Sequence, residues 1–209
     1  MSQTKTKSEE VFEDFLARQQ LPFVPIPTAG SPRPDYLVTC GPVKLVFEVK
    51  ELSEDEKFTN EPLKVSSRTV GDHVRRKIVD AKKQIQWGAA QGNPSVLLIY
   101  NNLDTVFHMF GTEDHDFLCA MYGEYTLLMD RATGEIRGQF FGRNQSLAEQ
   151  KNTSFSALGR LSPYLGEMGV TLFENTFAKL PIPYGELPPC FRVLRINIVR
   201  SEGSGENLR

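Results

Sequence analysis

The chain has 209 residues, of which 40% are hydrophobic and 24% charged, and its formal net charge is −2 at pH 7. This length and hydrophobic content suffice for one sizeable core, so we expect one domain rather than two. A nearly neutral chain excludes a large, generic nucleic-acid-coating surface, although it is compatible with a local basic stripe.

The first element that we expect is an amphipathic helix over residues 8–18. Ser8 is a candidate N-cap, and Glu9 and Glu10 place negative charge at the positive end of the helix dipole. Its apolar face consists of Val11, Phe12, Phe15 and Leu16. Residues 21–27 are interrupted by prolines, which favours an edge strand or an extended segment.

A β-hairpin is predicted over residues 36–50. Its two arms are rich in β-branched and apolar residues, and Cys40-Gly41-Pro42 between them is typical of a turn. Alternate side chains of a strand share a face, so Glu48 and Lys50 point one way while their neighbours point the other way. An acid and a base are therefore expected side by side on a rigid element.

The chain then returns to regular structure after a long polar segment. Residues 51–68 show no clean period, and a loop of that length is either functional or mobile. A second helix is predicted from Val70 to near Gly88, because apolar residues recur there at helical spacing. Residues 95–100 predict a strand buried on both faces, so the order is that of an α/β protein whose second helix crosses over to a parallel strand.

The second half of the chain carries weaker patterns. Residues 125–129 and 136–141 flank turn residues and predict a hairpin, and residues 145–156 predict a loop or lid. Residues 191–199 alternate as a terminal strand does, and residues 201–209 have the composition of a disordered tail.

The hairpin carries a recognisable pattern of charges. The order Pro34-Asp35, a hairpin-length gap and then Glu48-Val49-Lys50 resembles the signature of the PD-(D/E)XK nuclease superfamily. The resemblance covers residues 8–102 and implies a restriction-endonuclease-like αβββαβ core, in which helices flank a central mixed sheet. Residues 1–200 would then form a single nuclease-like domain, with residues 103–200 as C-terminal β-rich additions.

The resemblance implies a metal-dependent phosphodiester hydrolase. Hard cations such as Mg²⁺, with Mn²⁺ as a substitute, prefer carboxylate, carbonyl and water oxygens. The implied ligands are Asp35, Glu48 and the backbone carbonyl of Val49. Lys50 would position the attacking water and stabilise the charge that develops on the scissile phosphate.

Members of the superfamily often carry a further glutamate on the opening helix, which assists binding of the metal or of water. Glu9 fits that position best, because apolar residues follow it at the expected spacings of three and seven. Glu10 is its competitor, and Glu13 fits less well. Each of these acids also fits a purely structural role at the helix terminus.

The second helix supplies candidates for contact with the substrate. The resemblance implies that Gln84, and after it Lys77, approaches the substrate or orients the lysine. Arg75, Arg76 and Lys77 are candidate contacts to phosphates, although basic residues on a helix are usually a solvated face.

Other chemistries lack a supporting pattern. The histidines and cysteines have no metal-ligand spacing, and Asp114-His115-Asp116 is typical of a turn. Neither a phosphate-binding GxxxxGK[ST] loop nor a GxSxG motif occurs. No apolar run is long enough for a membrane span and no signal peptide is evident, so we expect a cytoplasmic protein with no membrane partner.

The expected partner is nucleic acid, DNA rather than RNA, and the sequence leaves open whether the protein acts as a homodimer. The alternative is a catalytically inactive PD-(D/E)XK scaffold that serves as a protein or nucleic-acid binding module.

Overall fold

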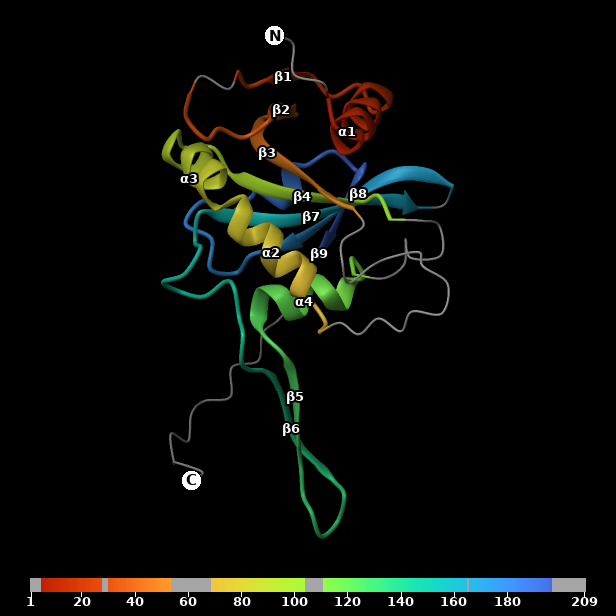
Figure 1. Cartoon of the computed structure of the whole chain (residues 1–209), viewed down its shortest axis with the longest axis vertical. Helices are drawn as coiled ribbons and strands as arrows, with labels where there is room; N and C mark the ends of the chain where they lie inside the picture. Colours follow the sequence, from red (N-terminus) through yellow and green to blue (C-terminus); the bar gives the residue numbers. More distant parts are fainter. Residues whose placement is uncertain (1–4, 28–29, 54–68, 104–110, 165, 197–209) are drawn as a thin grey trace.

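The computed structural model describes residues 5–27, 30–53, 69–103, 111–164 and 166–196. A mixed seven-stranded sheet in the order β1-β2-β3-β4-β7-β8-β9 lies at its centre, with helices on both faces (Figure 1). The helices are α1 (Lys7–Arg18), α2 (Asp72–Asp80), α3 (Lys82–Ala90), α4 (Asp114–Tyr122) and the short 3₁₀ helix η1 (Tyr184–Glu186). The strands of the sheet are β1 (Phe23–Pro25), β2 (Tyr36–Cys40), β3 (Val43–Leu52), β4 (Ser95–Asn101), β7 (Phe155–Tyr164), β8 (Glu167–Glu174) and β9 (Phe191–Leu194).

The first half of the chain follows the predicted order. Strands β1, β2 and β3 form an antiparallel meander, in which Tyr36 pairs with Phe47. Strand β4 is parallel to β3, and α2 and α3 make the crossover between them. The predicted hairpin, the edge strand and the buried strand are therefore confirmed, and the chain is an α/β protein.

The sheet separates two apolar cores. On one face, α1 packs against β2 and β3, and the rings of Phe12 and Phe47 lie 5.0 Å apart between centroids. On the other face, α2, α3 and α4 cover β4 and β7. Burial on both sides explains why β4 is apolar over nearly its whole length.

The second helix differs from the prediction, because it is two helices. Ala81 lies between α2 and α3, and its φ of −85° and ψ of −5° are in the right-handed α region but away from the ideal helical values. Ile78 and Ile85 on either side of the break are both buried. The break lets α2 lie against α4 while α3 lies against β3 and β4, so tertiary packing overrides the continuous apolar period.

The prediction of a turn at Asp114-His115-Asp116 is wrong, since these residues begin α4. Asp116 is buried and accepts hydrogen bonds from the backbone amides of Gly71 at 2.9 Å and Glu113 at 3.2 Å. A capping box with Glu113 satisfies the free amides of the first turn. Polar residues here therefore start a helix rather than a loop.

The second half of the chain extends the same sheet. Strand β7 is parallel to β4, β8 is antiparallel to β7, and β9 is parallel to β8. The predicted loop at residues 145–156 ends where β7 begins at Phe155, and the predicted terminal strand ends at Leu194. The predicted hairpin is confirmed as β5 (Tyr125–Met129) and β6 (Ile136–Phe141), which projects from the body (Figure 1).

Two expectations fall on segments outside the described residues. Most of the predicted loop at residues 51–68 and the whole of the tail at residues 201–209 belong to these segments. Within the described ranges, no helix is both long and apolar enough to cross a membrane.

Candidate active site

Asp35 lies immediately before β2, at the end of the β2–β3 ladder that is remote from the turn. Its backbone amide donates to the carbonyl of Phe47 at 3.0 Å, which continues the β2–β3 ladder by one residue. Its side-chain Oδ2 accepts from the backbone amide of Val49 at 2.7 Å. The carboxylate thus replaces a main-chain partner of β3, which fixes its position against that strand.

Glu48 and Lys50 share the face of β3 that carries α3, as the alternation predicted. Lys50 Nζ lies 2.6 Å from Glu48 Oε1, and the side chains are 28% and 2% exposed respectively. A charge as deeply buried as Glu48 is costly unless it is paired, so the lysine compensates part of that cost.

The second carboxylate oxygen of Glu48 lacks such compensation. Glu48 Oε2 is buried and has no hydrogen-bond partner among the described residues. The Asp35 and Glu48 side chains lie within hydrogen-bonding reach of each other, but two ionised carboxylates offer no hydrogen for that bond. The contact becomes favourable when a proton or a cation lies between them.

The electrostatics of the pair follow from this arrangement. Burial raises the pKa of Glu48 to about 8, and the negative charge of Asp35 adds to the effect, while Lys50 acts against it. Burial also raises the pKa of Asp35, although the hydrogen bond from the Val49 amide opposes it. The pair is therefore built to hold one positive charge, either as a proton or as a metal ion.

Lys50 is held as a cation. Burial acts to lower the pKa of Lys50, but the charge and hydrogen bond of Glu48, together with the charges of Asp35 and Asp80, outweigh it, and the net pKa is raised. Lys50 can therefore donate hydrogen bonds and neutralise negative charge, but it is a poor base. The sequence alone left the direction of this shift open.

The oxygen atoms at this position fit a divalent cation of the Mg²⁺ type. Glu48 Oε2 is an orphaned buried acceptor, and Asp35 keeps its Oδ1 outside the bond to Val49. The amide and carbonyl of one residue in a strand point to the same side, so the Val49 carbonyl points toward the side of Asp35. Mg²⁺ commonly takes one or two carboxylates and keeps several waters, which matches such a donor set.

Glu9 does not complete this set in the structure. Its carboxylate caps α1, accepting from the Thr6 amide at 2.6 Å and the Thr6 hydroxyl at 2.9 Å. Among the described residues, no three acidic, histidine or cysteine side chains gather as a metal site requires. The charge of Glu9 nevertheless acts on Asp35 and raises the pKa of that carboxyl, so α1 begins near the site.

The competing acids of α1 have structural partners. Glu10 forms an exposed ion pair with Lys7 at 3.3 Å. Glu13 accepts a hydrogen bond from the Tyr36 hydroxyl at 2.9 Å on the opposite face of the sheet from Glu48. Neither glutamate replaces Glu9 as the acid that influences Asp35.

Sequence reasoning missed Glu51, the next charged residue on β3. Its carboxylate accepts from the Ser8 amide at 3.1 Å and from the Asn102 side-chain amide at 2.8 Å. It therefore ties the N-terminus of α1 to the residue that follows β4. The available signal was its position in the run Glu48-Val49-Lys50-Glu51, where alternation puts it on the face of α1.

Helix α3 passes over β3 beside the site. Gly88 packs closely on Val46, where an added Cβ would lie 2.9 Å from Val46 Cγ1. The charge of Asp80, the last residue of α2, contributes to the raised pKa of Lys50. Gln84 is half-buried on α3, about one turn before Gly88. Lys77 is half-buried one turn before the break at Ala81.

Arg75, a predicted contact to phosphate, has several partners inside the protein. Its guanidinium donates to the carbonyls of Val70 at 2.9 Å, Cys119 at 2.8 Å and Asn144 at 3.1 Å, and pairs with Asp72 at 2.8 Å. The side chain thus links α2 to α4 and to the segment before β7, and these bonds use most of its N–H donors. Arg76 is exposed, and its Nη2 lies 2.8 Å from His73 Nδ1.

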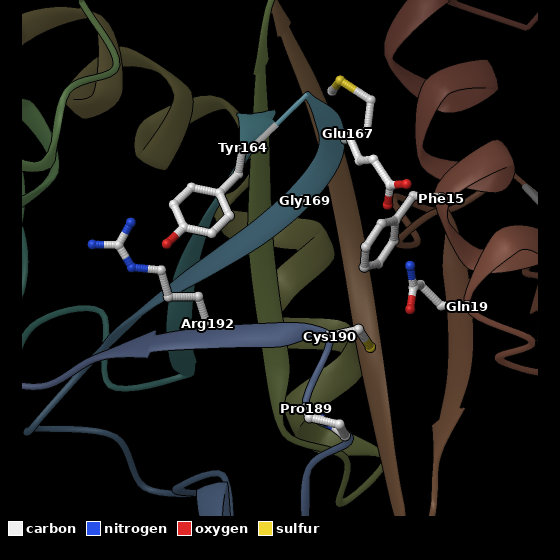
Figure 2. A pocket seen from close by; sticks show the side chains of 9 residues that line it. Phe15, Gln19, Tyr164, Glu167, Gly169, Pro189, Cys190 and Arg192 are labelled. Atoms are coloured by element: carbon white, nitrogen blue, oxygen red, sulfur yellow. The ribbon is translucent and has the colours of Figure 1, made fainter.

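A separate groove of about 380 Å³ lies between α1 and strands β8 and β9 (Figure 2). Its lining residues are Phe15, Gln19, Tyr164, Glu167, Met168, Gly169, Pro189, Cys190 and Arg192. The guanidinium of Arg192 lies over the ring of Tyr164, 5.4 Å from its centroid. None of the predicted site residues contributes to this groove, so it is distinct from the carboxylate pair.

Comparison with known proteins does not add to this description. No family model, no curated protein and no solved structure matches the chain. The fold and the site define an α/β protein with a mixed seven-stranded sheet, in which the buried carboxylate of Glu48 lies beside Lys50 and the half-buried Asp35.

Proposed function

We propose that the protein is a metal-dependent nuclease that acts on DNA and has a restriction-endonuclease-like fold of the PD-(D/E)XK superfamily. The observation that carries the proposal is the contact between Asp35 and Glu48, in which the buried Glu48 Oε2 lacks a hydrogen-bond partner among the described residues. The order of the first half of the chain, a helix, three strands, a crossover made by α2 and α3 and then a parallel strand, supports it, as does the Lys50–Glu48 ion pair.

Each residue has a role that follows from its surroundings. Asp35, Glu48 and the Val49 carbonyl would hold Mg²⁺, or Mn²⁺ in its place. When bound, the ion supplies charge neutralisation at the phosphate oxygens and lowers the pKa of a coordinated water. Lys50, held protonated by Glu48, donates to the attacking water or to a phosphate oxygen. Gln84 on α3 provides a further polar group on the substrate side.

A second candidate is the inactive scaffold that binds a protein or a nucleic acid. It is favoured by one observation: within the described residues, no third acidic, histidine or cysteine side chain joins Asp35 and Glu48 as a metal ligand. Metal binding separates the two candidates, because only the nuclease requires it.

The test compares cleavage of supercoiled and linear DNA in Mg²⁺, Mn²⁺ and EDTA. We expect cleavage by the wild-type protein with either metal, and loss of cleavage in Glu48→Gln, which keeps the shape of the side chain and removes its charge. Glu135→Gln is the matched control, since Glu135 is exposed near the tip of the β5–β6 hairpin. Undiminished cleavage by Glu48→Gln contradicts the proposal, and absence of both cleavage and calorimetric metal binding in the wild type favours the scaffold.

A further inference from the structure

A stacked pair joins the segment before Asp35 to helix α3. The guanidinium carbon of Arg33 lies over the ring of Trp87, 5.4 Å from its centroid. Arg33 precedes Asp35 by two residues, and Trp87 follows Gln84 by nearly one helical turn. The pair therefore connects the two elements that carry candidate site residues.

The arginine is held in a fixed orientation. Its Nε donates to the Ser31 hydroxyl at 3.2 Å, and its Nη1 donates to the Pro27 carbonyl at 3.3 Å. Stacking on an indole further restricts a planar guanidinium. A guanidinium has five N–H donors, so these two bonds leave others available.

The charge of Arg33 has no internal counterion in the described part of the chain. No carboxylate of the described residues lies within ion-pair distance of it, whereas Arg75, Arg137 and Arg160 each have such a partner. Arg33 itself is half-buried. An oriented and partly accessible guanidinium that has no counterion is suited to an anion from outside the protein.

The position of the pair indicates which anion. On α3, Trp87 precedes Gly88, which packs on Val46, and Val46 lies two residues before Glu48 on the same face of β3. The Arg33–Trp87 pair thus lies near the Val46 end of the face of β3 that carries Glu48 and Lys50. A strand of nucleic acid whose scissile phosphate meets Asp35 and Glu48 carries its neighbouring phosphates along that face.

We infer that Arg33 binds a backbone phosphate of the DNA flanking the scissile one, and that Trp87 is the positioning residue that holds it. This inference rests on the proposed nuclease function. An arginine fork accepts two phosphate oxygens at once, and a phosphate contact adds affinity that depends on salt and not on base sequence.

The test measures the salt dependence of DNA binding with Ca²⁺ in place of Mg²⁺, so that the DNA is bound without being cut. We expect Arg33→Gln to bind several-fold more weakly, with the slope of log K against log salt reduced by about 0.7 to 0.9. Arg18→Gln is the matched control, because Arg18 is exposed at the end of α1 on the other face of the sheet, and it should keep the wild-type slope. A purely structural role for Arg33 would lower the melting temperature and leave the slope unchanged, which would overturn the inference.

Trp87 offers an independent readout, because it is the only tryptophan of the chain. We expect duplex DNA to change the emission of Trp87 in the wild type and in Arg18→Gln, and to change it much less in Arg33→Gln. Trp87→Phe, which keeps an aromatic ring, should retain more affinity than Trp87→Ala. An emission that DNA does not alter, or DNA that does not bind, counts against the inference.

The two proposals fail separately. Cleavage in Mg²⁺ with an unchanged salt slope in Arg33→Gln overturns only the role of Arg33. DNA binding through Arg33 without cleavage in any divalent metal overturns only the nuclease activity.

Discussion

The two faces of the β2–β3 hairpin use the same backbone for different purposes. On one face, Tyr36 and Phe47 pack beneath α1, and both rings lie within 6 Å of Phe12, at 5.7 and 5.0 Å between centroids. On the other face, the buried carboxylate of Glu48 lies beside the half-buried carboxylate of Asp35. Strand alternation alone assigns neighbouring residues to opposite faces. We therefore expect stability to depend on the first face and chemistry on the second, so substitutions should separate the two.

The largest effect on stability is expected from Phe47→Ala. Phe47 is fully buried and contacts Phe12, so its removal leaves a cavity under α1 and should lower the free energy of unfolding by about 3–5 kcal/mol. Urea unfolding measures this change. Val79→Ala, at a position that is 72% exposed, is the control and should stay within about 0.5 kcal/mol. The DNA cleavage activity per folded Phe47→Ala molecule should equal that of the wild type. A lower activity per folded molecule would show that the α1 face also contributes to the chemistry.

On the opposite face, the ionised Glu48 should lower the stability of the protein in metal-free buffer. The pKa of Glu48 rises from 4.5 to about 8 on folding. Between these values the folded protein holds a proton that the unfolded chain has lost, so the free energy of unfolding falls as pH rises through this window. We expect a loss of roughly 2–4 kcal/mol, since each pKa unit corresponds to about 1.4 kcal/mol.

Glu48→Gln should flatten this dependence and make the metal-free protein more stable than the wild type above pH 8, as urea unfolding at a series of pH values will show. Glu135→Gln, at an exposed position, should keep the wild-type slope. A wild-type stability that rises over the same window would show that Glu48 is not buried as a protonated acid.

Mg²⁺ should stabilise the protein only when both carboxylates, Asp35 and Glu48, are present. Binding to the folded state alone raises stability by about 2.7 kcal/mol when Mg²⁺ exceeds its dissociation constant a hundredfold. We expect the melting temperature to rise with Mg²⁺ in the wild type and in Val79→Ala, but not in Asp35→Asn or Glu48→Gln. An equal rise in all four proteins would place the metal elsewhere.

Local patterns account for what the sequence predicted about the site. Alternation over Glu48 to Lys50 is a property of any extended strand, and a turn at Gly41 fixes the register that brings Asp35 beside Glu48. These predictions needed no knowledge of distant residues. For the same reason the α/β order of the first half could be predicted from periodicity and turn residues.

Long-range contacts account for what the sequence did not predict. The break at Ala81 depends on α2 and α3 packing on different neighbours, and the burial of Asp116 depends on the amide of Gly71, far away in the chain. Arg75 has the residue type of a phosphate contact, but three backbone carbonyls take its donors. Local sequence cannot distinguish an arginine used inside the protein from one available to a ligand.

The smallest effect on stability is expected at Glu51, which is next to the site residues in sequence but lies on the other face of β3. Glu51 follows the site motif directly, yet alternation places it on the face of α1, where it accepts from the Ser8 amide at 3.1 Å. Glu51→Ala should remove this interaction with the helix N-terminus and lower the free energy of unfolding by about 1 kcal/mol in urea titrations. Glu10→Ala, which breaks an exposed ion pair on the same helix, should cost less than about 0.5 kcal/mol. If Glu51→Ala instead abolishes cleavage at unchanged stability, a carboxylate on the α1 face takes part in the chemistry. Stability and chemistry would then not be separated between the two faces of the hairpin.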